Sequence, residues 1–493
     1  MAASSPASVT PSPAVAATVG RPAAKGGPAT PSGPGSGLAP SITLPLRFIL
    51  TGMVSLLGGL GLLCARPDLL TEYHYNQYVI AATHLFVLGF LTTVVMGAMY
   101  QLVPVALETR LFSERLARWQ FGFHVCGFVG MVAMFWIWDL KQVGHFGSVL
   151  AVGVAMFAYN LGRTLWRVPR WTVVATGIAS ALVWLCLTVF MGLLVAAGKC
   201  TYESVEEMTP AGPLWVVLKA LQATARGINR FDALGVMHAH AHLGVVGFFV
   251  MMIVSVSYKL LPMFLLSDLQ SERRARASIH LLNLALVGLF FTIALRSSWK
   301  WIPAVIGAAA VGAYAGEILS ILRARRRRTI DWGLRYFLTA VGLLLAVAFL
   351  GVGLSWPGLA VTEFTSQLET VYGFVGILGV VTFTILGFLY KIVPFLVWYH
   401  RYSREVGRHR VPSLADLYSE RLQIVGYWFF LGGLALGVSG ALSGRELLAR
   451  LGALGLLASL AVFGANLAGM LRHLVRPQLA PLSSPLKPTP QLP

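Results

Sequence analysis

A stretch of about 23 residues occurs three times in this chain, and this repeat limits the possible folds more than any other feature. In each copy a glycine, a tyrosine and a proline follow a key position at intervals of 5, 16 and 20 residues. The copies read ATHLFVLGFLTTVVMGAMYQLVP with His84 at the key position, HAHLGVVGFFVMMIVSVSYKLLP with His242, and GFVGILGVVTFTILGFLYKIVP with Phe374. A repeated unit predicts a fold of three related parts, of which two keep a histidine and one has phenylalanine instead.

The composition places these repeats in a membrane. Hydrophobic residues make up 56% of the chain, charged residues 12%, and the mean hydropathy is +0.72, which excludes an ordinary soluble protein. A membrane-spanning helix needs roughly 20 apolar residues. Twelve stretches meet this requirement, near 45–65, 77–104, 119–140, 146–168, 172–198, 236–264, 277–296, 301–322, 334–354, 369–398, 420–441 and 448–472.

The repeat falls on the second, sixth and tenth of these stretches, so the unit is four helices. We therefore predict an all-α integral membrane protein of about twelve transmembrane helices, arranged as three pseudo-symmetric four-helix repeats. The predicted twelve-helix domain covers residues 42–475, with repeats near 42–171, 172–333 and 334–475. Residues 1–41 are rich in Ala, Pro, Ser and Gly and predict a disordered cytoplasmic tail, and residues 476–493 predict a Pro-rich C-terminal tail.

The net charge is +19, and the distribution of this charge indicates a membrane topology and not a nucleic-acid partner. Lysine and arginine concentrate after the even-numbered spans, as in the run Arg325 to Arg328 after the eighth. Positive charge stays on the cytoplasmic side of a membrane and is attracted to anionic lipids. We therefore predict a multi-pass protein of a bacterial-type inner membrane with both termini in the cytoplasm. The lipid bilayer is its expected partner, and nucleic acid is excluded.

Histidines inside the membrane are the candidate functional residues. This topology puts His84 and His242 at the same depth, about two turns below the outer boundary, and a polar ring in hydrocarbon usually has a function. The motif M-H-A-H-A-H-L also places His238 and His242 one turn apart, with His240 on another face. Because imidazole is the commonest ligand for transition metals, His238, His240 and His242 are candidate metal ligands. Hydrogen-bonded structural histidines are the alternative.

Two further observations concern possible chemistry. Glu317 is the one carboxylate well inside a predicted span, so it is a candidate for a proton pathway; pairing with a neighbouring helix is the alternative. The chain contains no C-x-x-C-H motif, so covalent attachment of a c-type heme is excluded.

The layout resembles subunit I of the heme-copper oxidases, which has twelve helices in three four-helix arcs and ligand histidines on helices two, six and ten. The sequence pattern is most similar to that of the C-type cytochrome c oxidases and bacterial nitric oxide reductases. Their sixth helix carries a histidine, a Gly-Phe-Phe run, a tyrosine and a proline at nearly the present spacing. The matching residues here are His242, Gly247, Phe248, Phe249, Tyr258 and Pro262. This resemblance covers roughly residues 42–475. The chain also resembles a second family, the NnrS-like twelve-helix membrane proteins.

The resemblance implies roles for some residues and shows where others are missing. It implies that His84 matches an axial ligand of a low-spin heme and His242 a copper ligand. The tenth helix of the family contributes two heme-binding histidines, whereas the matching positions here are Tyr372 and Phe374. The histidine pair of the seventh helix, which completes the copper site, is also absent, since this helix offers only His280 near its other end.

These departures leave two main functions open. The first is a cytochrome c oxidase subunit I-like oxidoreductase relative that binds b-type heme through His84 and His242 and takes part in electron transport, with a cytochrome or another redox subunit as partner. The second is a protein of the same scaffold that binds or transports copper, heme or nitric oxide without catalysis. A scaffold whose histidines are structural relics is the third reading.

Overall fold

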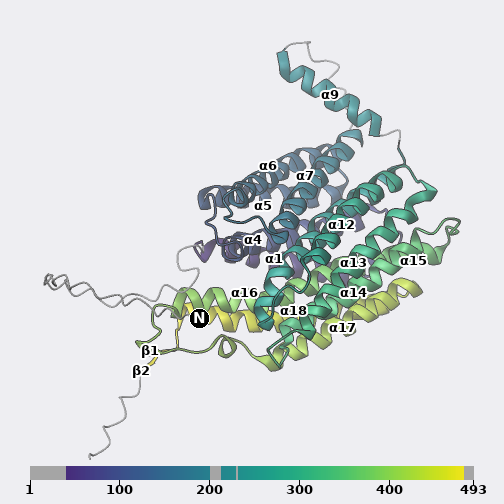
Figure 1. Ribbon diagram of the computed structural model, residues 1–493. Helices are drawn as coiled ribbons and strands as arrows, with labels where there is room; N and C mark the ends of the chain where they lie inside the picture. Colours follow the sequence, from purple (N-terminus) through teal and green to yellow (C-terminus); the bar gives the residue numbers. More distant parts are fainter. Residues whose placement is uncertain (1–39, 200–211, 229–230, 482–493) are drawn as a thin grey trace, which may run out of the picture. The chain divides into compact units, whose positions relative to one another are not determined.

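The computed structural model describes residues 40–199, 212–228 and 231–481. Within these ranges, twelve helices are long and apolar enough to cross a membrane, which confirms the predicted all-α membrane architecture (Figure 1). Nine of the spans are formed by single long helices. These are α1 (Thr43–Ala65), α5 (Glu114–Ile137), α6 (Leu140–Leu165), α7 (Val173–Lys199), α12 (Glu272–Ala294), α13 (Trp301–Arg323), α14 (Trp332–Leu354), α17 (Glu420–Ser443) and α18 (Glu446–Val475).

The three spans that carry the repeat have a different construction, because each is interrupted by a π-helical segment. The second span consists of α3 (Gln77–His84), η1 (Leu85–Thr92) and α4 (Thr93–Ala106). The sixth consists of α10 (Ala233–His242), η2 (Leu243–Val250) and α11 (Met251–Leu265), and the tenth of α15 (Glu363–Phe374), η4 (Val375–Thr382) and α16 (Phe383–Tyr402).

Each π-helix begins at the residue after the key position and is 8 residues long. Such segments are rare and are often found at functional sites. In the first and third copies, threonine hydroxyls donate to carbonyls five residues earlier: Thr92 to Val87 at 2.8 Å and Thr382 to Ile377 at 3.0 Å. These bonds follow the wider turn of the backbone. The π-helix therefore belongs to the repeat itself, and it redirects the chain just past the key position.

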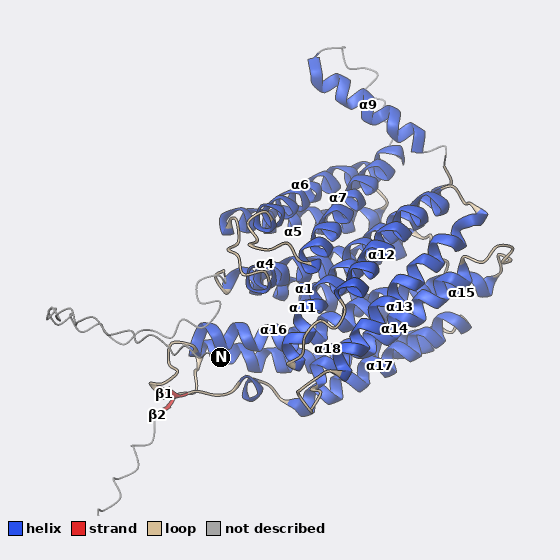
Figure 2. Ribbon diagram, in the orientation of Figure 1, coloured by secondary structure: helices blue, strands red, loops and turns tan. Residues whose placement is uncertain are grey.

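The short elements lie in the connecting segments. They are α2 (Asp68–Thr71), α9 (Gly212–Ile228), the 3₁₀ turns η3 (Ser298–Lys300) and η5 (Leu414–Leu417), and the strands β1 (His409–Arg410) and β2 (Ala480–Pro481). The two strands pair antiparallel and are the only ones among the described residues (Figure 2). The predicted tails at 1–41 and 476–493 lie largely outside the described residues. Within the second tail, the Gln478 backbone N–H donates to the Tyr402 hydroxyl at 2.9 Å.

The three repeat helices form the centre of the bundle. The fraction of buried residues in their most apolar windows is 61% for Gln77–Ala106 and 83% for both Ala233–Leu265 and Glu363–Tyr402, against 22–50% for the other nine spans. The π-helix η4 packs against both η1 and η2, whereas η1 and η2 pack less closely against each other. The three parts of the chain thus meet along the helices that carry the key positions.

The glycine of the repeat allows close packing at this centre. A Cβ atom at Gly247 in η2 would lie 2.8 Å from the Cβ of Trp184 in α7. Small residues permit such approaches between membrane helices. In the other two copies, a Cβ at Gly89 would lie 3.0 Å from the Cβ of Ser55 in α1, and one at Gly379 would lie 3.1 Å from Leu434 in α17.

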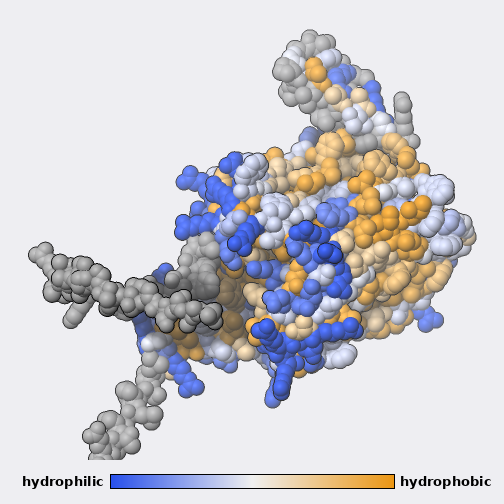
Figure 3. All heavy atoms as spheres, in the orientation of Figure 1, coloured by the Kyte–Doolittle hydropathy of each residue, from blue (hydrophilic) through white to orange (hydrophobic). Residues whose placement is uncertain are grey.

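The outer helices present apolar side chains to their surroundings. Large exposed hydrophobic residues include Phe291 of α12, Val305 of α13 and Phe349 of α14. On the face drawn in Figure 3, hydrophobic side chains gather over these helices, and strongly hydrophilic side chains gather beside them. A surface of this kind requires a lipid bilayer, so the chain is a multi-pass membrane protein.

Candidate functional site

His84 is the last residue of α3, directly before η1. Its Nδ1 lies 2.8 Å from the carbonyl oxygen of Ile80, one turn earlier, and its ring packs against Phe135 of α5 with a centroid distance of 4.6 Å. A carbonyl only accepts, so Nδ1 carries the proton and Nε2 of the neutral ring is an unprotonated acceptor. No hydrogen bond joins this Nε2 to another residue of the described chain.

His242 occupies the same place in the sixth span and is oriented in the same way. Its Nδ1 lies 2.7 Å from the carbonyl oxygen of His238, and its Nε2 lies 3.2 Å from the Tyr372 hydroxyl. By the same reasoning Nε2 accepts, so Tyr372 donates. The ring of Tyr372 stacks on His242 with an interplanar angle of 27°. The tyrosine of α15, at a position where the resembling family has a heme ligand, is thus a hydrogen-bond partner of His242.

His240 points to another side of the sixth span, toward α7. A Cβ atom added to Gly192 would lie 3.0 Å from His240 Cε1, so the glycine makes room for the ring. His240 is also within electrostatic reach of His84. Its Nδ1 is buried and has no hydrogen-bond partner among the described residues. Such an orphaned nitrogen is uncommon and calls for a ligand or a water molecule.

His238 takes part in a third group, at the N-terminal ends of the central helices. Its Nε2 lies 3.0 Å from Nε2 of His74, which precedes α3. The same His74 atom is 3.9 Å from Glu369 Oε2, which belongs to α15. Burial lowers the pKa of His74, so its ring is neutral near pH 7. His238 and His242 lie one turn apart on α10 with different partners, and His240 lies on another side of this helix. A single ion held by all three stays a prediction.

The key position of the third repeat is filled by an apolar ring. Phe374 is buried, and a Cβ at Gly437 of α17 would lie 2.8 Å from its Cζ. Its side chain occupies the space between α15 and α17. In the seventh span, His280 is exposed on α12. Neither helix therefore supplies the histidines that the family resemblance would require.

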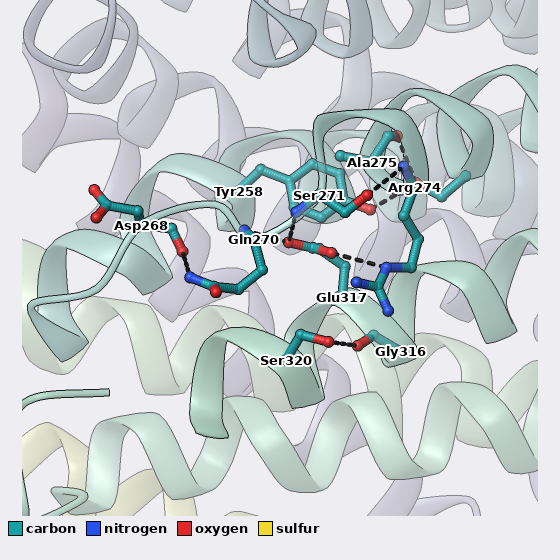
Figure 4. Close-up of polar contacts among 10 residues, drawn as sticks. Tyr258, Asp268, Gln270, Ser271, Arg274, Ala275, Gly316, Glu317 and Ser320 are labelled. Atoms are coloured by element: carbon teal, nitrogen blue, oxygen red, sulfur yellow. Dashed lines mark hydrogen bonds and ion pairs between the residues drawn. The ribbon is translucent and has the colours of Figure 1, made fainter. Parts of the chain in front are cut away.

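Glu317 is fully buried on α13 and binds the start of α12 (Figure 4). Its Oε1 accepts the backbone N–H groups of Gln270 at 2.7 Å and Ser271 at 2.9 Å, and its Oε2 lies 2.9 Å from Arg274 Nε. A carboxylate at a helix N-terminus satisfies free N–H groups and interacts favourably with the helix dipole. These contacts give Glu317 a structural task, and its part in a proton pathway stays a prediction.

The other two repeats have asparagine in the same task. Asn160 of α6 binds the backbone N–H and carbonyl of Ser113 at 3.0 and 2.8 Å, and Asn466 of α18 binds those of Ser419 at 2.8 and 3.0 Å. Ser113, Ser271 and Ser419 are the N-cap residues of α5, α12 and α17. Each repeat thus anchors the start of its third helix to its fourth helix by one buried polar side chain.

His124 of α5 and His473 of α18 are bound within the protein, consistent with structural roles. His124 Nε2 lies 2.9 Å from the Thr93 hydroxyl, and His473 Nδ1 lies 2.8 Å from the Tyr402 hydroxyl.

Sequence reasoning did not single out Glu369. It lies five residues before the key position of the third repeat, and His74 lies ten residues before that of the first, so no common spacing relates them. The only signal was an acidic residue early in an apolar span. The separate repeats had to fold together before the two residues could be seen as neighbours.

Comparison with known proteins gives a match to a family model and matches to solved structures. Residues 36–143 match the family model described as Cytochrome C and Quinol oxidase polypeptide I. The structure is similar to that of a heme-copper terminal oxidase dimer determined by cryo-EM, with a TM-score of 0.53 and 13% sequence identity over 87% of this chain and 83% of that chain. At this identity the similarity shows the fold. No curated protein matches the sequence.

Proposed function

We propose that this chain, for which the matched family model and the fold support the heme-copper oxidase subunit I superfamily, binds a b-type heme between its second and sixth helices and takes part in electron transfer. The residues that would hold its iron are His84 and His242. One observation carries the proposal: both rings direct Nδ1 to the carbonyl one turn earlier, and both therefore present an unprotonated Nε2. Histidine ligands of metals are typically oriented by such a bond.

The residues present fit the group in their chemistry and their location. Neutral imidazole is an axial ligand of heme iron. The looser packing between η1 and η2, compared with the contacts that both make with η4, favours a ligand on that side. His240, with its orphaned Nδ1 and its proximity to His84, is a further nitrogen donor in this region.

The bound heme would supply a reversible one-electron couple, and the protein would set its surroundings. The apolar π-helices would exclude water, since η1 and η2 contain no charged residue. Tyr372, whose hydroxyl now donates to His242 Nε2, would have to give up that bond when the nitrogen becomes a ligand. Its hydroxyl would then be free to donate elsewhere in the pocket.

The orientation and partners belong to the same proposal. The distribution of positive charge supports an inner membrane of bacterial type with both termini in the cytoplasm. The His84 and His242 ends of the central helices would then lie near the outer face, where a cytochrome or another redox subunit could deliver electrons.

The test is a reduced-minus-oxidised spectrum of the purified full chain, with a pyridine hemochrome assay. We expect about one heme per chain, a stoichiometry typical of one bis-histidine site. His84→Ala and His242→Ala should each lose the heme, whereas His124→Ala, which removes a buried histidine bound to Thr93, should keep it. His240→Ala tests which histidine of the sixth helix binds the heme: the heme should stay if His242 is the ligand and be lost if His240 is. Full heme content in a His84→Ala/His242→Ala double variant would disprove the ligand assignment.

A second candidate is a protein that binds copper, heme or nitric oxide without turnover. The observation that favours it is the occupation of the tenth-helix ligand positions by Tyr372 and Phe374, which removes the family's second set of heme ligands. Bound metal without heme in the same sample would support this candidate over electron transfer.

A further inference from the structure

The N-terminal ends of the three central helices bring together three side chains that no part of the proposed heme site uses. These are His74 from the segment before α3, His238 from α10 and Glu369 from α15. Their ligand atoms all lie within 4.8 Å of one another. Among the described residues, this is the only group of three or more His, Cys, Asp and Glu side chains with such spacing.

We propose that His74, His238 and Glu369 form a binding site for a divalent transition-metal ion, to which each of the three repeats contributes one ligand. The ligand atoms are Nε2 of both histidines and Oε2 of the glutamate. The site is separate from the proposed heme and does not depend on it.

The distances are close to those of a coordination sphere. Zinc–nitrogen and zinc–oxygen bonds of about 2.0–2.2 Å in a tetrahedral site place neighbouring ligand atoms about 3.3 Å apart. Here Nε2 of His74 is 3.0 Å from Nε2 of His238 and 3.9 Å from Glu369 Oε2. All three ligand atoms lie within 4.8 Å of one another, so side-chain adjustments that shorten the longer separations would bring them onto one ion.

The chemistry of the donors indicates the kind of metal. Two imidazoles and one carboxylate form a set that Zn²⁺ uses with water in the fourth position and that non-heme Fe²⁺ also uses. Hard ions such as Mg²⁺ and Ca²⁺ prefer sites made entirely of oxygen. The group thus selects for a borderline ion and leaves at least one coordination position for water or another small ligand.

The ligand side chains are open to the surface, and the ring of His74 is held in place by a neighbouring ring. The His74 side chain is 14% exposed and that of Glu369 40% exposed, so an ion can enter from the surface. The ring of Tyr73 packs against that of His74 at a centroid distance of 4.6 Å. His74 Nδ1 is buried without a partner among the described residues, so the polar contacts of this ring all lie on the Nε2 side.

Positive charges near this group lower its affinity for a metal ion. The positive charge of Lys300 interacts electrostatically with both His238 and Glu369, and that of Arg296 interacts with Glu369. Arg296 is also 3.4 Å from Asp232, whose carboxylate caps α10 by accepting the Gly235 N–H at 2.6 Å. These cations weaken, but do not replace, coordination of a metal ion by two neutral imidazoles and a carboxylate. We therefore expect binding that Lys300→Ala would strengthen.

The test uses the full-length chain in detergent, stripped of metal and titrated with Co²⁺ as a spectroscopic substitute for Zn²⁺. We expect one Co²⁺ per chain with visible d–d bands that Zn²⁺ displaces. His74→Ala, His238→Ala and Glu369→Gln should each weaken binding by a factor of ten or more, since loss even of a supporting residue typically costs about 10–100-fold. Gel filtration confirms that each variant is folded.

Matched controls are available in the same chain. His145→Ala removes an exposed histidine at the start of α6, and Glu363→Gln removes an exposed carboxylate from the first turn of α15. Both should bind Co²⁺ as the wild type does. Should His238→Ala fail to fold, His74→Ala and Glu369→Gln, which alter a loop and a half-exposed position, still decide the question. Absence of saturable Co²⁺ binding, or binding that all three variants retain, would show that the group is only a hydrogen-bonded cluster.

The heme content of the same variants separates this proposal from the function proposed above. His74→Ala and Glu369→Gln should keep the heme while losing Co²⁺, and His84→Ala should lose the heme while keeping Co²⁺. Either proposal can therefore fail without the other.

Discussion

Replacement of Glu317 should show whether this buried carboxylate holds the bundle together. In Glu317→Ala, the N–H groups of Gln270 and Ser271 lose their acceptor, and Arg274 loses its partner inside the protein. Each buried N–H left without a partner costs about 1–3 kcal/mol, and removal of one member of a buried ion pair costs about 3–5 kcal/mol. Because Arg274 remains 39% exposed, water compensates part of the ionic loss. We expect a loss of about 3–5 kcal/mol in the free energy of unfolding.

Glu317→Gln is the decisive comparison. Its amide oxygen still accepts the two backbone N–H groups, but its NH2 group cannot accept from Arg274, so the ionic contact with this partly exposed side chain is lost. The expected cost is about 1–2 kcal/mol. The neighbouring repeats offer a matched control. Asn466→Ala removes the contacts with Ser419 and a 3.3 Å bond to the Tyr390 hydroxyl and should cost about 2–4 kcal/mol.

The assay is denaturant-induced unfolding of the purified protein in detergent micelles, followed by tryptophan fluorescence. The order of stability should be wild type, Glu317→Gln, Glu317→Ala. If Glu317→Ala costs less than about 1 kcal/mol, a value typical of any substitution, the carboxylate does not anchor α12. If Glu317→Gln is as damaging as alanine, the charge matters more than the two backbone bonds, and our reasoning from the asparagine repeats is wrong.

Three further predictions concern packing, the C-terminal segment and pH. Gly247→Ala would force a methyl group to within 2.8 Å of Trp184 Cβ and should cost about 1–3 kcal/mol, measured as a lower thermal midpoint. Tyr402→Phe removes hydroxyl bonds to a histidine of α18 and to a backbone N–H near β2, so limited proteolysis should cut the C-terminal segment faster, and an unchanged rate would contradict this. The hydrogen bonds from Arg66 lower the pKa of Asp68, so their stabilisation is present above the ordinary value of about 3.9 and is lost as the pH falls through the lower folded value. Asp68→Asn should accordingly reduce the slope of acid unfolding, measured by circular dichroism.

Much of the architecture could be predicted because it depends on local composition. Twelve apolar stretches give twelve helices, since each must satisfy its own backbone hydrogen bonds in lipid. The repeat of Gly247, Tyr258 and Pro262 falls on the most buried helices, a finding that the sequence analysis did not predict. The π-helices could not be predicted, since nothing in an apolar run separates one helical hydrogen-bond pattern from another.

The candidate site divides in the same way. The sequence by itself determined that His84 and His242 occupy equivalent positions, because their spacing to the glycine, tyrosine and proline is identical. Only the tertiary structure decided which side chains face each other: Tyr372 beside His242, and His74 with His238 and Glu369. These pairs are separated by more than a hundred residues and lie in different repeats. Their contacts depend on how three helices rotate about their axes when they pack, and no single helix carries that information.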